Sequence, residues 1–287
     1  MKIKDHFLSQ EIFEIKETSI KGVFKTFPIP QNISKYYESE DYISHHQDSG
    51  SLKEKLYKFL QSFNLIYKRD IILKEMKVFS NACVDLKSER NAIKILDYGC
   101  GAGEFLKVME KDFSTIGFEP NEDARNAAQQ KTSKTQFISN LNDIENESLD
   151  VITLWHVFEH IENQDEILEN FYKKLKPNGK LIIAVPNCTS YDAKHYVAFW
   201  AAYDVPRHIY HFSKTGMQNL IKEKSEHWNL KKIRYLLLDS FYISMLSEKY
   251  KKNAFSWFFG GIHGAISNFK ALKTGEFSSL VYIIEKK

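Results

Sequence analysis

A short apolar segment that runs directly into closely spaced glycines constrains the fold of this 287-residue chain more than any other feature. Residues 92–98 read Ala-Ile-Lys-Ile-Leu-Asp-Tyr, and Gly99, Gly101 and Gly103 follow before a helix-like stretch begins at Phe105. Glycine lets a backbone turn tightly and lets a ligand approach without a Cβ in the way. The first turn of a helix offers free N–H groups and a partial positive charge, which suit a carboxylate. The segment therefore predicts a buried strand, a ligand-binding loop and a helix.

Strand-like and helix-like segments alternate along the rest of the chain. Short apolar runs predict seven strands, at residues 92–98, 114–119, 135–139, 149–155, 180–185, 232–238 and 280–285. Spacings of three and four between apolar residues predict helices at 51–82, 105–111, 122–131, 165–175 and 215–224. This alternation is typical of an α/β fold, in which helices cover both faces of a parallel sheet.

Charge and composition exclude several classes of protein. The 40 basic and 37 acidic side chains give a net charge of +3, too even for the concentrated basic face of a nucleic-acid partner. No window holds eighteen uninterrupted apolar residues, so no membrane span is expected, and the charged N-terminus does not resemble a signal peptide. The three cysteines form no C-x-x-C pair, which favours a reducing cytoplasm over a disulfide framework or a zinc site.

Glu119 ends the second expected strand, where an acid can accept hydrogen bonds from the hydroxyls of a ribose. Nicotinamide enzymes share this arrangement, but their glycine fingerprint is G-x-G-x-x-G. Here the third glycine, Gly103, comes one place early, and Glu104 stands in the position of the last fingerprint glycine. The spacing therefore disfavours a nicotinamide-dependent oxidoreductase.

Four motifs together resemble those of the class I S-adenosylmethionine (SAM)-dependent methyltransferases. The sequence Asp-Tyr-Gly-Cys-Gly-Ala-Gly at residues 97–103 resembles the first motif of that family, D-x-G-C-G-x-G. Residues 149–152, 175–181 and 278–284 resemble its fourth-strand motif, the turn before its fifth strand and its antiparallel last strand. The resemblance implies a Rossmann-like, seven-stranded, mostly parallel sheet with helices on both faces. It divides the chain into an N-terminal extension and helical cap (1–90) and a SAM-binding domain (91–287).

The resemblance also implies which residues hold the cofactor. The first motif would hold the methionine part of SAM, Glu119 the ribose, and the segment after the third strand the adenine, with Asn140 in place of an acid. Two residues at the end of the fourth strand would line the same pocket. The predicted cofactor-binding residues are Asp97, Gly99, Cys100, Gly101, Gly103, Glu119, Pro120, Asn140, Leu141, Trp155 and His156.

The segment His156-x-x-Glu159-His160 follows the fourth strand. It matches the H-x-x-E-H motif of inverted zinc proteases, but such a site needs its histidines on one helix face and a third ligand. It is more similar to the E-x-x-E-H motif of ubiquinone-biosynthesis O-methyltransferases, which is linked to a divalent cation. His156 replaces the first acid, whereas magnesium prefers oxygen ligands. We therefore predict no metal here, and expect Glu159 and His160 to shape the cofactor pocket and cap the following helix.

The methyl acceptor is expected beyond the fifth strand, in two insertions at about residues 187–213 and 240–277. We expect residues 187–213 to be extended. This stretch leaves the carboxyl end of the fifth strand, and ligands of open α/β sheets bind beyond such ends. For a hydroxyl acceptor the enzyme must remove a proton, and histidine suits that role. His208 is the first candidate for this base and His211 the second. Arg207 either holds an anionic acceptor or pairs with Asp204.

The sequence favours O-methylation of a small molecule. Many DNA and protein amino-group methylases carry an Asn/Asp-Pro-Pro-aromatic tetrapeptide after strand four, and this chain has Trp-His-Val-Phe there. A non-catalytic protein that binds SAM on the same fold is the alternative. The aromatic run at residues 255–259 favours core packing over an apolar acceptor pocket. Tyrosines and histidines near the N-terminus form either part of a lid over SAM or a packed strap, namely Tyr36, Tyr37, Tyr42, His45 and His46.

Overall fold

The computed structural model describes residues 1–37, 52–76 and 92–287. Its largest unit is a seven-stranded sheet built from β4 (Lys94–Tyr98), β5 (Ser114–Phe118), β6 (Gln136–Ile138), β7 (Leu149–Trp155), β8 (Leu175–Pro186), β10 (Trp228–Tyr235) and β11 (Ser279–Lys286). The strand order is β10-β11-β8-β7-β4-β5-β6. Strands β4 to β8 run parallel, and β11 is antiparallel to both β8 and β10. The seven predicted strands and the antiparallel last strand are confirmed.

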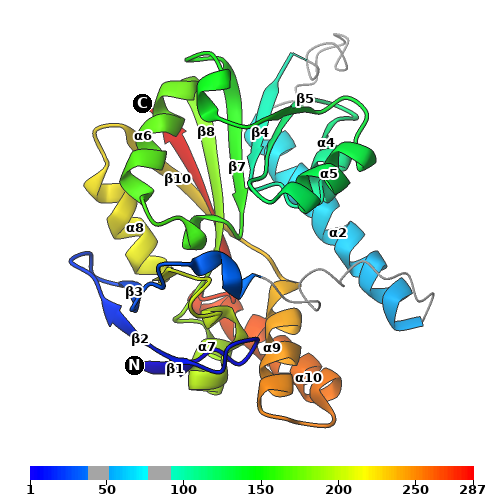
Figure 1. Cartoon of the computed structure of the whole chain (residues 1–287), viewed down its shortest axis with the longest axis vertical. Coiled ribbons are helices and arrows are strands. Elements are labelled where there is room, and N and C mark those ends of the chain that lie inside the picture. Colours follow the sequence, from blue (N-terminus) through cyan, green and yellow to red (C-terminus); the bar gives the residue numbers. More distant parts are fainter. Residues whose placement is uncertain (38–51, 77–91) are drawn as a thin grey trace.

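Helices cover both faces of this sheet (Figure 1). Alternate strand residues point to opposite faces, as the period of a strand requires. Ile95 and Val151 pack with residues of α2 (Leu52–Glu75) and α4 (Glu104–Met109), whereas their neighbours Leu96 and Ile152 pack with α6 (Gln164–Lys174) and α8 (Lys214–Glu223). Helix α5 (Glu122–Lys131) connects β5 to β6. Both apolar sides of the parallel strands are thus removed from water, which is typical of such sheets.

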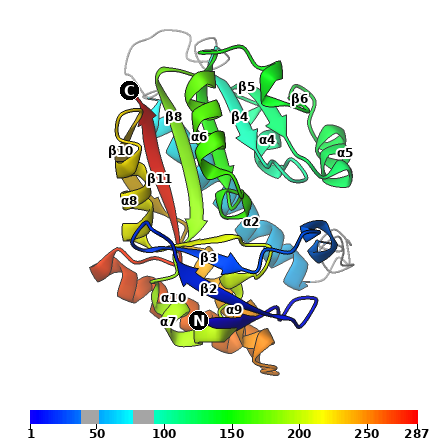
Figure 2. The ribbon, with the colours of Figure 1, turned by 60° about the vertical axis from the view of Figure 1, so that its left-hand side comes forward.

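A second, smaller sheet joins the N-terminus to the segment predicted as the first acceptor insertion (Figure 2). It is antiparallel and has the order β1 (Lys2–Lys4), β2 (Ile12–Glu17), β3 (Val23–Phe27) and β9 (Tyr210–Phe212). Phe24 is paired with His211 across β3 and β9. The N-terminal extension is therefore hydrogen-bonded to residues beyond the fifth parallel strand. Three of the residues proposed for a lid, Tyr42, His45 and His46, lie outside the described residues. The end of the helix predicted for 51–82 also lies outside them.

The stretch after β8 is not extended, so that expectation is wrong. It folds into α7 (Tyr191–Tyr196) and two 3-10 turns, η5 (Val197–Phe199) and η6 (Ala201–Tyr203). The Ser190 hydroxyl caps α7 by accepting the Ala193 N–H, and the buried Asp192 accepts a hydrogen bond from the Trp200 indole. A serine N-cap is a local start signal for a helix. Three more 3-10 turns are η1 (Ile33–Tyr36), η3 (Leu141–Asp143) and η4 (Phe158–His160).

The second predicted insertion forms two packed helices, α9 (Asp239–Tyr250) and α10 (Ser256–Thr274), at the lower end of the molecule in Figure 1. The prediction that the aromatic run at 255–259 packs into the core is wrong. Phe255 and Trp257 are each 62% exposed, and Phe258 is 50% exposed. Among the described helices, none is long and apolar enough to cross a membrane.

Candidate functional site

The glycine loop after β4 turns through the left-handed region of backbone space. Gly99, Gly101 and Gly103 have φ values of +78°, +52° and +78°. A Cβ at Gly99 would come 2.5 Å from Val157, and one at Gly103 would come 2.8 Å from Ala128, so these two glycines allow close packing. A Cβ at Gly101 would meet no atom within 4 Å. The backbone at Gly101 therefore faces open space that a ligand can occupy.

Glu119 follows β5 and is held against this loop. One of its carboxylate oxygens accepts the Gly101 N–H at 2.9 Å, and the other accepts the Asn121 N–H at 2.9 Å. A carboxylate has about four lone-pair sites, so Glu119 keeps capacity for two further donors. The loop and the acid together fit a nucleoside with adjacent ribose hydroxyls.

Asp97 lies at the inner end of the loop with 2% of its surface exposed. Burial raises the pKa of its carboxyl group to about 6, although Thr153 donates a 2.7 Å hydrogen bond that favours the charged form. Lys68 of α2 opposes this charge and lies 4.7 Å above the ring of Trp155. Burial lowers the pKa of Lys68, against the attraction of Asp97 and Asp239. The pair offers opposite charges to an amino acid zwitterion.

The other predicted cofactor residues lie at the ends of neighbouring strands. Pro120 is exposed after β5, and Cys100 is buried in the loop. Asn140 follows β6, where its side chain accepts the Asn142 N–H and caps η3, and Leu141 is buried beside it. Trp155 ends β7 and packs edge-on against Phe105. The structure thus brings the predicted cofactor residues together at the carboxyl ends of four adjacent strands.

His156 joins the ends of β7 and α9. Its φ is +58°, its Nε2 lies 2.8 Å from Asp239 Oδ2, and its Nδ1 lies 3.5 Å from Glu159 Oε1. Burial lowers the pKa of this imidazole, but the two carboxylates outweigh burial and raise the pKa to about 9. His156 is therefore an imidazolium at neutral pH.

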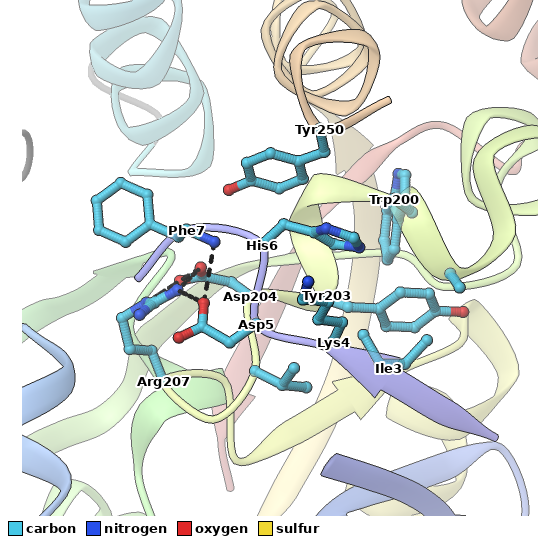
Figure 3. Close-up of a pocket in the computed structure, with 12 residues that line it drawn as sticks. Ile3, Lys4, Asp5, His6, Phe7, Trp200, Tyr203, Asp204, Arg207 and Tyr250 are labelled. Carbon is cyan, nitrogen blue, oxygen red and sulfur yellow. Dashed lines mark hydrogen bonds and ion pairs between the residues drawn. The ribbon is translucent and has the colours of Figure 1, made fainter. Parts of the chain in front are cut away.

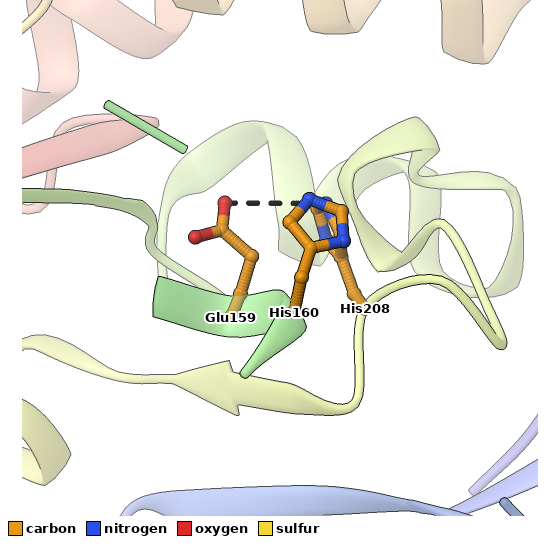
Figure 4. Close-up of side chains that lie close together, drawn as sticks. All are labelled: Glu159, His160 and His208. Atoms are coloured by element: carbon orange, nitrogen blue, oxygen red, sulfur yellow. Dashed lines mark ion pairs between the residues drawn. The ribbon is translucent and has the colours of Figure 1, made fainter. Parts of the chain in front are cut away.

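Glu159 is 1% exposed, and neither carboxylate oxygen has a hydrogen-bond partner among the described residues. Burial raises the pKa of Glu159, but the surrounding histidines reverse this effect and lower it. Figure 4 shows Glu159 beside His160 and His208. The ligand atoms of these three residues lie within 4.8 Å of one another, a set that could hold a divalent cation. Glu159 does not cap α6, contrary to the sequence-based expectation.

His208 lies opposite Glu159 and is 9% exposed. Its Nδ1 lies 2.9 Å from the Ala202 carbonyl, so Nδ1 carries the proton and Nε2 keeps a lone pair. That Nε2 is 3.9 Å from Glu159 Oε1. Burial, with help from the neighbouring His160, lowers the pKa of His208 to about 4. The side chain is therefore a neutral imidazole whose lone pair faces a carboxylate.

His211, the second predicted base, lies elsewhere. It is 4% exposed within the small sheet, and its Nε2 is 2.8 Å from the hydroxyl of Thr26. That hydroxyl donates to the His208 carbonyl, so it accepts a hydrogen bond from the Nε2–H of His211. The structure does not place His211 on the cavity described below.

A cavity of about 440 Å³ lies between the ends of β7 and β8, the turn after η6, and α9. Its polar lining consists of His156, Asp204, Arg207, His208 and Asp239. The remaining surface is apolar or aromatic and comes largely from α9, including Tyr242, Ile243, Leu246 and Tyr250. A concave apolar site with a few converging polar groups is typical of a small-molecule pocket.

Arg207 pairs with Asp204, one of the two possibilities that the sequence left open. Its guanidinium is buried, bonds to Asp204 at 2.6 Å and to Asp5 at 3.1 Å, and lies 4.7 Å above the ring of Phe7 (Figure 3). Another of its donors reaches the Tyr36 carbonyl. The arginine therefore ties the N-terminal segment to the cavity.

Sequence reasoning missed Lys68, Asp5 and Asp239. Asp239 stands in the first turn of α9, where an acid is common for local reasons, and its partner His156 is 83 positions away. Asp5 and Arg207 are 202 positions apart. No local pattern marks such pairs, since each depends on how distant segments meet.

This strand order, with a positive-φ glycine loop after β4 and an acid after β5, is that of a Rossmann-like protein that binds a nucleoside cofactor. Residues 67–224 match the family described as methyltransferase domain, and the chain belongs to that family. Its cofactor is SAM, which the open backbone at Gly101 and the two unfilled acceptor positions of Glu119 fit.

Curated proteins similar to this chain include the ubiquinone biosynthesis O-methyltransferase of Rickettsia bellii. It is 30% identical over 165 residues, which cover 50% of this chain and 65% of that protein. An uncharacterized protein of Methanocaldococcus jannaschii is 28% identical over 156 residues, or 53% of this chain and 58% of that protein. The chain therefore spans less than two thirds of the length of these relatives.

Two solved structures have a similar fold. The cyclopropane synthase MmaA2 from Mycobacterium tuberculosis has a TM-score of 0.51 at 13% identity, covering 88% of this chain and 95% of that one. The plantazolicin methyltransferase BpumL, solved in complex with a triazolic desmethylPZN analog and SAH, has a TM-score of 0.52 at 16% identity, covering 88% of this chain and 93% of that one. At these identities the likeness shows the shared fold.

Proposed function

We propose that the protein transfers the methyl group of SAM to a hydroxyl group of a small molecule bound in the 440 Å³ cavity. The observation that carries this proposal is the position of the cavity. His156, at the end of β7, and His208 both line it, so it extends from the cofactor side of the sheet to the proposed base. The O-methyltransferase names of the similar curated proteins support hydroxyl as the acceptor group.

The cofactor would lie across the ends of β4 to β7. Glu119 would accept the ribose hydroxyls, and the backbone at Gly101 would lie against the methionine part. Asp97 would bind the amino group of the methionine part, and Lys68 the carboxylate. When bound, SAM supplies an electrophilic methyl carbon and its own leaving group, so the protein must orient the acceptor and remove one proton.

His208 is the proposed base. Its Nε2 lone pair and the Glu159 carboxylate, 3.9 Å apart, repel each other unless a proton donor lies near both. An acceptor hydroxyl at this position would give its proton to Nε2 while its oxygen attacks the methyl carbon. Glu159 would then stabilise the imidazolium, since burial keeps its charge poorly solvated. Because the pKa of His208 is about 4 in the protein without ligands, its Nε2 is unprotonated and can accept a proton throughout the neutral pH range.

The base assignment is tested with His208→Gln in a labelled-methyl assay over a panel of phenols and alcohols. We expect kcat to fall by about 10²–10⁴, the usual contribution of a general base, with the SAM dissociation constant unchanged in calorimetry. His227→Gln is the matched control, because His227 is half-exposed, stacks on Tyr172 and does not line the cavity. For the unmodified enzyme at saturating SAM, the part of the fall in kcat/KM for the acceptor that comes from protonation of His208 should appear only as pH approaches 4. Equal rates for His208→Gln and the unmodified protein would refute the base.

The panel also separates the proposal from a non-catalytic SAM-binding protein. Heat on mixing with SAM but no methylated product from any acceptor would favour the binding protein. No heat with SAM would refute the cofactor geometry itself.

We further propose that turnover needs no metal, although Glu159, His160 and His208 could together hold a cation. His160 Nδ1 interacts with the Arg207 carbonyl at 2.9 Å, which orients the ring with or without a metal. The reason to expect no metal is chemical, because SAM brings its own leaving group and methyl transfer needs no Lewis acid. Protein dialysed against a chelator should keep its rate, and loss of activity that zinc or magnesium restores would contradict this.

A further inference from the structure

Helix α10 turns its smallest residues inward. Gly260 and Gly264 are buried against α9, where a Cβ would come 2.4 Å from Met245 and 2.7 Å from Phe241. Ser267 and Ala271 continue the same buried face. Contact through small residues brings the two helices close together and leaves the bulky residues of α10 on its other side.

The outward side carries a stripe of large apolar residues. Phe258, Ile262, Phe269 and Leu272 are 50%, 41%, 67% and 69% exposed. Their spacing of four, seven and three residues places them on one face of the helix. Single exposed apolar residues are ordinary, but a continuous stripe over four turns indicates a binding surface.

Aromatic side chains extend this surface at the start of α10. Phe255 and Trp257 are each 62% exposed, and Phe259 is 40% exposed. The rings of Trp257 and Phe258 are 5.9 Å apart. Exposed tryptophan and phenylalanine beside an apolar helix face are typical of helices that lie in the interface of a bilayer.

The charge around the stripe has one sign. Residues 249–274 contain five lysines and no Asp or Glu, and all five lysines are exposed, namely Lys249, Lys251, Lys252, Lys270 and Lys273. The preceding Glu248 is buried, accepts a hydrogen bond from Asn253 and pairs with Lys251 at 3.8 Å, so four of the lysines face this side without an acidic partner within the segment. A second copy of the chain on this face would set lysines near lysines, whereas anionic headgroups would complement them. Each lysine near such a surface strengthens attachment.

We propose that the outer face of α10, with the lysine-rich turn before it, docks on the anionic phospholipid surface of a bilayer. The apolar side chains would enter the boundary between headgroups and acyl chains, and the lysines would remain among the phosphates. The helix would lie on the membrane, since no described helix can span one. Because α9 lines the cavity and packs on α10, docking would bring that wall of the cavity close to the membrane (Figure 1).

The test is co-sedimentation of the full-length protein with vesicles of phosphatidylcholine alone, or of phosphatidylcholine mixed equally with phosphatidylglycerol. We expect binding to the mixed vesicles, weak binding to phosphatidylcholine, and weakening by salt. Phe269→Ser with Leu272→Ser should reduce the affinity at least about tenfold through lost apolar burial. Lys249→Gln with Lys252→Gln should weaken the preference for phosphatidylglycerol, since three of the five lysines remain.

Phe63→Ser with Ile66→Ser is the matched control, because these residues are 63% and 50% exposed on α2. This control should bind vesicles like the unmodified protein, and thermal melting should show that every variant is folded. Three results would overturn the proposal: no binding of the unmodified protein to mixed vesicles, equal loss in the α2 control, or no loss in the α10 variant. If the unmodified protein did not bind vesicles but formed dimers in sedimentation velocity, and only the α10 variant was monomeric, the face would instead bind a second copy of the chain. Because the experiment measures vesicle binding, its result does not depend on whether the protein transfers a methyl group.

Discussion

The cofactor side and the acceptor side of this protein are assembled in different ways. On the cofactor side, Gly101 bonds to Glu119 only 18 positions away, and both follow adjacent parallel strands. On the acceptor side, Arg207 bonds to Asp5 across 202 positions and His156 to Asp239 across 83. The first side is encoded in short motifs, whereas the second exists only once four distant segments have packed together.

This difference implies that the two sides respond differently to substitution. Strand ends and a glycine loop fix the cofactor groups through backbone geometry, which few side chains control. The acceptor groups are fixed by buried ion pairs between side chains, so loss of one partner leaves the other charge buried. Damage on the acceptor side should therefore reduce stability while SAM binding survives.

Arg207→Met should give the largest effect. The substitution leaves Asp5, which is 1% exposed, without its cation, and we expect the free energy of unfolding to fall by about 3–5 kcal/mol. Urea titration measures this loss, and calorimetry on the folded variant should find an unchanged SAM dissociation constant. Arg234→Met is the control, because Arg234 is 40% exposed beside Glu75 and its pair should contribute less than about 1 kcal/mol. Loss of SAM binding in folded Arg207→Met would show that the two sides are not separable.

The same contrast explains what the sequence could predict. The seven strands were predictable because short apolar runs bounded by turn residues indicate buried strands locally. The glycines at 99, 101 and 103 likewise indicate a tight turn locally. The aromatic run at 255–259 was misassigned because composition does not reveal whether a helix face finds a partner in the fold. Helix α7 was not predicted, because it has only six residues and the Ser190 cap alone does not define a helix. Lys68 was unpredictable, since α2 reaches the loop only through tertiary packing.

A matched pair of glycines sharpens the description of the cofactor side. Gly103→Ala places a methyl group 2.8 Å from Ala128, so it should be less stable than Gly101→Ala by about 1–3 kcal/mol. Gly101→Ala has no such clash and should lose only the cost of a left-handed alanine, about 1–2 kcal/mol. Its methyl group enters the proposed cofactor space, so SAM affinity should fall roughly tenfold, equal to about 1.4 kcal/mol. Unchanged SAM affinity in Gly101→Ala would place the cofactor elsewhere.

The smallest expected effect concerns pH and His156, which touches both sides. Its pKa is raised from 6.5 to about 9 in the folded protein, so between those values the folded state binds more protons than the unfolded state. Its stabilising contribution is therefore complete below pH 6.5 and is lost as pH rises through 9. We expect a loss on the order of 1 kcal/mol, reduced because the side chain is 32% exposed. Unfolding measured from pH 6.5 to 9 should show this decline in the unmodified protein and a flatter profile in His156→Gln. An identical decline in both would mean that Asp239 and Glu159 do not stabilise a protonated His156. The contact between the cofactor and acceptor sides would then not depend on this positive charge.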